Sequence, residues 1–170
     1  MQKFFSLFLL LAFALTLTGC YSFRGISIPP EVNTFTVENF DNRANAIVPG
    51  MAQDFTQTLK DKIRNESRLD ESPRGQVADI EFSGYISKYD VNSVAPKPNE
   101  QTSLSQLKIF VKVDVAYRDR KFEDKEFNQT FNFQVEYPAE QNLLDIQDQL
   151  IEQIFDQITD DIFNKAFTDW

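Results

Sequence analysis

Several residue types are scarce in this 170-residue chain, and each scarcity removes a class of function. There is no histidine, which excludes Ser-His-Asp triads, Cys-His dyads and histidine-ligated zinc. A single cysteine excludes an internal disulfide and a cysteine-rich metal site. The five glycines form no phosphate-binding loop. Because 17 Lys+Arg face 26 Asp+Glu, with a net charge of −9, nucleic-acid binding is also disfavoured. The chain therefore predicts one acidic domain that is no enzyme and holds no cofactor or metal.

The N-terminal residues have the pattern of a bacterial lipoprotein signal. Residues 4–17 are apolar except for Ser6 and Thr16, a run shorter than the ~20 residues that span a membrane. The run ends in Leu17-Thr18-Gly19-Cys20, which is a lipobox. The pattern predicts a signal peptide over 1–19 and lipidation of Cys20. The alternatives are an ordinary signal peptide with a chance cysteine, or a buried core cysteine.

The residues after Cys20 indicate where the mature protein lies. Tyr21 stands where aspartate would favour inner-membrane retention, so similarity to the best-known sorting rule favours the periplasmic leaflet of the outer membrane. The lipidated cysteine and a short tether occupy 20–33 and can span at most ~45 Å. A single domain is expected over 34–170. The mature chain from Cys20 onward carries 16 basic and 26 acidic residues, a net charge of −10.

Hydrophobic periodicity predicts the elements of that domain. A strand is expected at 34–40, followed by a helix that opens at Pro49 and has an apolar residue at every fourth position. Three alternating strands follow, around 79–89, 107–117 and 127–137, and then a long helix capped by Asn142. The stretch 91–101 is expected to be irregular. The prediction is an α+β fold, a two-layer α/β sandwich of order β-α-β-β-β-α, with a four-stranded mixed sheet and two helices on one face.

Two clusters in the sequence are candidate contact sites. Residues 118–125 form the densest basic cluster, with Arg118, Arg120 and Lys121 as candidates for gripping phosphate. The acids between them favour the alternative, a soluble hairpin turn. At the C-terminus, spacing places Phe163, Phe167 and Trp170 roughly opposite the apolar stripe of the helix. Either they are exposed for a partner, or the helix end kinks or is wrapped by the tether.

The remaining candidates are weaker. The solvent face of the predicted sheet carries Tyr85, Tyr89 and Phe110, which is open to a partner unless it is simply solvated. Paired carboxylates are abundant, as in glycosidases, but they lie on predicted solvent faces or in turns. A Ser-Lys dyad stays an open alternative.

Several segments together resemble the LptE family of lipopolysaccharide-assembly lipoproteins. No one of them is diagnostic alone, but the resemblance covers nearly the whole mature chain. The matching segments are Cys20-Tyr21-Ser22-Phe23, Ser27-Ile28-Pro29-Pro30, Phe40-Asp41-Asn42-Arg43, the helix residues 55–62 and the closing residues 162–167.

The resemblance implies a binding and scaffolding role. Such proteins partner the outer-membrane β-barrel LptD, help to assemble and plug it, and assist insertion of lipopolysaccharide into the outer leaflet. Because both lipopolysaccharide and this domain are anionic, any contact between them must be local, and Arg118, Arg120 and Lys121 are its candidates. One alternative is a periplasmic scaffold or activator lipoprotein of another envelope enzyme, against which the short tether argues. A lipid- or glycan-degrading enzyme is the other.

Overall fold

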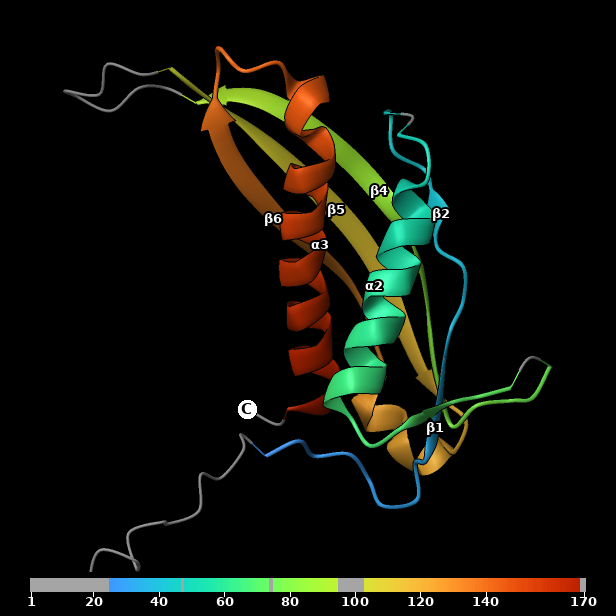
Figure 1. Cartoon of the computed structure of the whole chain (residues 1–170). Helices are drawn as coiled ribbons and strands as arrows, with labels where there is room; N and C mark the ends of the chain where they lie inside the picture. The colour runs from blue at the N-terminus through green and yellow to red at the C-terminus, as the bar shows by residue number, and fades with distance from the viewer. Residues whose placement is uncertain (1–24, 47, 74, 95–102, 169–170) are drawn as a thin grey trace, which may run out of the picture.

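The computed structural model describes residues 25–46, 48–73, 75–94 and 103–168. Its helices are α2 (Met51–Glu66) and α3 (Leu143–Phe167), and a 3₁₀ helix, η1, covers Arg120–Lys125. Its strands are β1 (Thr34–Val37), β2 (Asp41–Asn42), β3 (Asp70–Glu71), β4 (Ile80–Val94), β5 (Leu104–Tyr117) and β6 (Phe127–Pro138). Figure 1 shows the long strands β4, β5 and β6 rising behind the two helices.

The strands form one mixed sheet of order β3-β1-β4-β5-β6, with β2 paired to β4. The pairing of β1 with β4 is parallel, as expected for a strand-helix-strand crossover, whereas β4, β5 and β6 form an antiparallel meander. The prediction of four strands was wrong, because β2 and β3 add two more. Each has only two residues, so neither produces a hydrophobic alternation that sequence could reveal.

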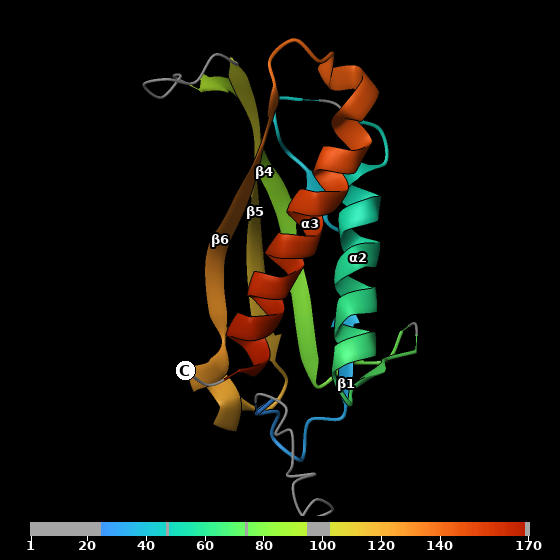
Figure 2. The same ribbon diagram turned by 60° about the vertical axis from the view of Figure 1, so that its left-hand side comes forward.

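Both helices cover the same face of the sheet, which makes a two-layer sandwich (Figure 2). The stripe of α2 that faces the sheet is buried at Met51, Phe55, Leu59 and Ile63, as its four-residue spacing predicts. The helix begins at Met51 rather than at Pro49. The cap predicted for α3 is confirmed, since the Asn142 side chain accepts a hydrogen bond from the backbone N–H of Leu144 at 3.2 Å.

A β-bulge changes which side of β4 faces the helices. Register shifts between Ile86 and Lys88, so Ser87 is an extra residue and the alternation of side chains reverses after it. Tyr89, expected on the solvent face, is therefore buried, and its hydroxyl donates to Oε1 of Gln147 on α3 at 3.2 Å. The strand also continues to Val94, so the residues after 90 that were expected to be irregular belong to β4 as far as the structure describes them.

Residues 25–33 lie against the domain rather than apart from it. Ile26 forms an isolated bridge with Thr168, and the N–H of Ser27 donates to the carbonyl of Phe167 at 2.7 Å. Arg68 donates to the carbonyl of Pro29 at 2.7 Å, and Val32 is buried in the core. Both ends of the described chain therefore meet at the base of the sandwich. Among the helices that the structure describes, none is long and apolar enough to cross a membrane.

Candidate partner-binding surface

One face of the sheet carries no helix (Figure 2). We call it the open sheet face. It is formed by alternate residues of β4, β5 and β6, whose side chains point away from α2 and α3. Its central members are Tyr85, Lys88, Lys108, Phe110, Lys112, Asn128, Thr130, Asn132, Gln134 and Glu136. Tyr85 and Phe110 lie there half-buried, as predicted, whereas Tyr89 does not.

Basic groups lie on both aromatic rings of the open sheet face. The guanidinium of Arg43 lies 4.1 Å from the ring centre of Tyr85. The ammonium groups of Lys88 and Lys108 lie 5.4 and 5.1 Å from the ring centre of Phe110. Such contacts hold aromatic and cationic groups side by side at an accessible surface. No sequence pattern predicts the position of Arg43, because it depends on the pairing of the two-residue strand β2 with β4.

A shallow hollow of about 340 Å³ lies on the same face, next to Tyr85. Its walls carry both signs of charge, including Asp41, Arg43, Lys112 and Asp114. Neighbouring charges partly satisfy one another, since Arg43 pairs with Asp41 at 3.0 Å and Lys88 with Asp90 at 2.5 Å. The arrangement favours hydrogen bonding and aromatic contact with a polar partner over attraction of one sign of charge.

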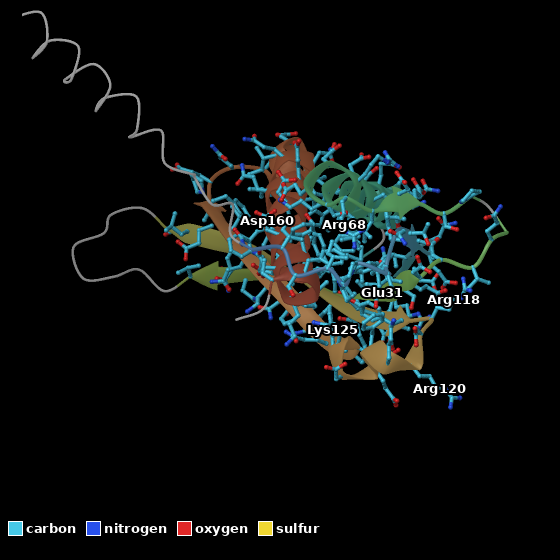
Figure 3. All side chains as sticks on the ribbon, turned by 90° about the horizontal axis from the view of Figure 1, so that it is seen from below. Glu31, Arg68, Arg118, Arg120, Lys125 and Asp160 are labelled. Carbon is cyan, nitrogen blue, oxygen red and sulfur yellow. The ribbon has the colours of Figure 1, made fainter. Side chains whose placement is uncertain are left out.

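The basic residues predicted to contact lipopolysaccharide lie at the base of the sandwich, around η1. Lys121 pairs with Glu31 at 3.1 Å and with Asp119 at 3.4 Å, and these bonds raise the pKa of Lys121 above its usual value. Arg118 approaches Asp79 at 4.0 Å. Among the described residues, Arg120 has no hydrogen-bond or ion-pair partner, and Figure 3 shows it pointing away from the ribbon. The structure therefore brings the three together, but leaves only Arg120 of this trio unpaired.

The aromatic residues predicted to contact a partner at the C-terminus are not exposed. Phe163 and Phe167 are 4% and 1% exposed, so the expectation that they form a surface patch was wrong. The ring centres of Phe163 and Phe167 lie 5.0 Å apart, and the ring centre of Phe167 lies 6.0 Å from that of Phe82 in the sheet. The alternative of a wrapped helix end holds, because residues 26 and 27 bond to the end of α3. Trp170 lies outside the described residues.

The helix layer has the opposite character to the open sheet face. A groove of about 480 Å³ between α2 and α3 is lined by acids and by Lys62, which pairs with both Asp160 and Glu66. Burial is the largest influence on the pKa of Lys62 and acts to lower it, but the hydrogen bonds to these two carboxylates outweigh it and raise the pKa. Its charge thus ties the two helices together. Within the described ranges, no group of three Asp, Glu or Cys residues could hold a metal ion.

The fold and the site define a class of protein: an α+β sandwich with both helices on one face of the sheet. Its candidate site is the other face, which is a docking surface. The family model described as "LptE: Lipopolysaccharide-assembly" matches residues 32–166, so the chain belongs to the LptE family. The resemblance found in the sequence is thereby confirmed. The family is one of non-enzymatic lipoproteins.

Solved structures with a TM-score of 0.50 or more share the fold at low sequence identity. Lipoprotein B from Nitrosomonas europaea has a TM-score of 0.51 at 12% identity, covering 85% of this chain and 88% of that one. Protein XCC0632 from Xanthomonas campestris has a TM-score of 0.50 at 11% identity, covering 81% and 87%. Rare lipoprotein B from Shewanella oneidensis has a TM-score of 0.49 at 13% identity, covering 78% and 92%. No curated protein matches the chain significantly in sequence.

Proposed function

We propose that this protein is an outer-membrane lipoprotein, anchored through Cys20, that partners an LptD-like β-barrel. It helps to assemble and plug the barrel and assists insertion of lipopolysaccharide into the outer leaflet. Membership of the LptE family over residues 32–166 is the observation that carries the proposal. The mature chain begins at Cys20, with 1–19 as signal peptide, 20–33 as anchor and tether, and 34–170 as the domain.

The open sheet face supports the role of a plug. The interior of an outer-membrane barrel is polar, so a plug needs a surface that offers hydrogen bonds without burying unpaired charge. The row from Asn128 to Gln134 offers amides and a hydroxyl, while Tyr85 and Phe110 offer aromatic contact area. Tyrosine and phenylalanine are enriched at protein interfaces. We place the barrel contact on this face, because Phe163 and Phe167 are buried.

Direct contact with lipopolysaccharide is confined to a small site in this proposal. A net charge of −10 on the mature chain opposes an anionic ligand over most of the surface. Arg120 is the predicted contact residue that has no acidic partner among the described residues. A guanidinium left unpaired can form a forked pair with a phosphate.

Co-purification tests the partnership. The protein is purified by affinity from detergent-solubilised outer membranes, and the captured proteins are identified by mass spectrometry. We expect a large β-barrel in near one-to-one amount. Recovery of a cell-wall enzyme instead would favour the scaffold or activator function.

Phe110→Glu on the open sheet face should lower barrel capture about tenfold, which corresponds to ~1.4 kcal/mol.

A matched variant on the helix layer is the control for the mutation on the open sheet face. Gln153→Glu adds the same charge on the exposed side of α3, and we expect capture to stay within twofold of wild type. Equal loss in both variants would contradict the open sheet face as the contact.

Lipidation is tested separately from partnership. We expect Cys20→Ala to abolish incorporation of labelled fatty acid and to release the protein from membranes, because the thiol is the attachment point. Labelling that persists in this variant would contradict the lipobox interpretation.

A further inference from the structure

The outer edge of β6 presents a long row of backbone groups that pair with nothing in the described protein. The strand is hydrogen-bonded to β5 on one side and ends the sheet on the other. Figures 1 and 2 both show no ribbon beyond it. An edge strand of this kind is a template for another strand, and proteins usually protect it.

The hydrogen-bond register fixes which residues face outward. The N–H of Ala139 donates to the carbonyl of Ser103 at 2.9 Å, so the pair Ser103 and Ala139 is a hydrogen-bonded pair. Such pairs alternate along an antiparallel ladder, and odd-numbered residues of β6 therefore bond to β5. Pro138, which has no N–H, falls at an outward position, as this register requires. The N–H and C=O groups that point to the free edge belong to Asn128, Thr130, Asn132, Gln134 and Glu136.

The two edges of the sheet differ in protection. At one edge, β3 has two residues, both acidic, and Glu71 is paired with Arg64. At the other edge, β6 has 12 residues and runs without a bulge along β5. Between Phe127 and Tyr137 it contains no proline and no lysine, and Glu136 is its only charge. The devices that block strand addition are thus present at β3 and absent at β6.

The side chains at this edge match a strand that is polar on one face and apolar on the other. The outward-bonding residues project polar, exposed side chains onto the open sheet face. On the helix side, Phe133 and Val135 are half-buried and remain open to cover by a neighbour. The outward row from Asn128 to Glu136 spans about 27 Å, the length of the 9–11-residue strands of an outer-membrane barrel, which alternate in the same way.

A second copy of this chain fits the edge less well. Two identical edges commonly pair antiparallel about a two-fold axis, and that axis would set the bases of the two sandwiches at opposite ends. The described chain starts at the base, where Ile26 meets Thr168. At most ~20 Å of chain joins residue 25 to a lipid on Cys20, so two copies anchored in one membrane could pair in this way only with β6 lying along the membrane surface.

We propose that the free edge of β6 accepts a strand of the partner barrel by β-augmentation. The inference rests on the proposed partnership and deepens it. The outward groups of β6 bond to a barrel strand whose own edge is still unpaired, and the polar and apolar faces of the two strands align. The edge thereby holds a strand that would otherwise expose its backbone before the barrel closes.

A peptide tests the edge without the barrel. The probe is a short synthetic peptide in which Thr and Gln alternate with Val and Phe, and the control peptide has the same composition in blocks. The readout is amide hydrogen exchange of the folded domain, resolved by residue. We expect the probe to slow exchange at Thr130, Asn132 and Gln134, while Phe131 and Phe133, already bonded to β5, change little. Protection elsewhere, protection by both peptides, or none overturns the proposal.

Paired variants isolate the backbone donor. Thr130→Pro removes one outward N–H and leaves the β5 ladder intact, and Thr130→Ala changes the side chain but keeps the N–H. We expect the proline variant to weaken binding of the probe at least tenfold and the alanine variant less than twofold. Circular dichroism and the unfolding midpoint confirm that both variants fold. If Thr130→Pro unfolds, Asn132→Pro with Asn132→Ala repeats the comparison. Equal affinity of the proline and alanine variants would refute the edge as the site.

Barrel capture distinguishes the two levels of the proposal. If wild type captures the barrel and Thr130→Pro captures it equally well, the edge proposal fails and the partnership stands. If wild type captures no barrel, the partnership fails, and with it the barrel as occupant, whatever the peptide shows. A concentration-dependent dimer that Thr130→Pro abolishes would identify a second copy as the occupant and overturn the proposal.

Discussion

The absence of one side chain, at Gly84, sets how closely a ring can pack on the sheet. A Cβ at Gly84 would lie 2.1 Å from the carbonyl oxygen of Lys112 on β5 and 2.7 Å from Cε1 of Phe40. The ring of Phe40 packs in that space and contacts Phe55 of α2, with ring centres 4.9 Å apart. The sequence showed Gly84 in the apolar alternation of a strand, but the residue that fills its place comes from a distant segment.

Replacing Gly84 should therefore destabilise the sandwich. In Gly84→Ala the methyl group meets backbone, which cannot swing away as a flexible side chain would, so β4 and β5 must separate locally. We expect a loss of about 2–3 kcal/mol in the free energy of unfolding, typical of overpacking, measured by chemical denaturation. Gly25→Ala is the control, because nothing lies within 4 Å of its Cβ. An unchanged midpoint in Gly84→Ala would show that the strands accommodate the methyl group.

Asp79 joins the start of β4 to the start of β1. Its carboxylate accepts from the N–H of Asn33 at 2.9 Å, and from the N–H and hydroxyl of Thr34 at 3.1 and 3.0 Å. The bond from the Asn33 N–H, helped by those from Thr34, lowers the pKa of Asp79 below its ordinary value. A carboxylate with a lowered pKa stabilises the folded state above the unfolded pKa of ~4.

The stability that Asp79 supplies should be lost in acid. As pH falls from about 5 through the lowered folded pKa, the wild type should lose more free energy of unfolding than Asp79→Asn, which has no charge to protonate. The measurement is the free energy of unfolding of both proteins at several pH values. Parallel pH profiles for the two proteins would contradict a lowered pKa at this residue.

At the scale of elements, long regular patterns were predictable and short or irregular ones were not. The stripe of α2 and the alternation of β5 each repeat over many residues, so the sequence shows them directly. The bulge at Ser87 shifts register by a single residue and leaves no mark in composition. Tyr89 was consequently placed on the wrong face. The strands β2 and β3 depend on their neighbours and carry no pattern of their own.

The end of α3 belongs to the buried face of the helix. Spacing was expected to place Phe167 opposite the main stripe, yet its ring packs against Phe82 of the sheet and against Phe163. Phe155, Thr159, Phe163 and Phe167 recur every four residues and are all buried, so the buried face is broader than the Ile stripe alone. We expect Phe167→Ser to lower the free energy of unfolding by about 3–5 kcal/mol, as for removal of a buried phenylalanine, measured by denaturant titration. Leu144→Ser at the start of α3 is the control and should cost less than 1 kcal/mol, because Leu144 is 77% exposed. An unchanged free energy of unfolding in Phe167→Ser would contradict the burial of this residue.

At the scale of the whole molecule, negative charge is distributed unevenly between the helix layer and the sheet. Residues 138–170 carry eight acids and one lysine, so much of the negative charge gathers on and around α3. The open sheet face instead mixes both signs with aromatic rings. The apolar patterns predicted both helices on one face of the sheet and the other face wet, and the structure has this arrangement. The patterns could not show the free edge of β6, because strand order is a property of the assembled sheet.

The tether also belongs to the whole molecule, since residues 25–33 close the base of the sandwich. Val32 is 2% exposed within the core, Ser27 bonds to the end of α3, and Arg68 holds the carbonyl of Pro29.

A chain that begins at Thr34 loses all three contacts, whereas one that begins at Gly25 keeps them. We expect the shorter chain to be less stable by about 3 kcal/mol, from the lost burial of Val32 and two hydrogen bonds. That loss should lower the midpoint of thermal unfolding by roughly 8–12 °C. The two chains are compared by calorimetry at the same pH and protein concentration. Equal midpoints would mean that residues 25–33 are only a spacer, and the domain could then swing on a tether of the full ~45 Å instead of sitting within ~20 Å of its anchor.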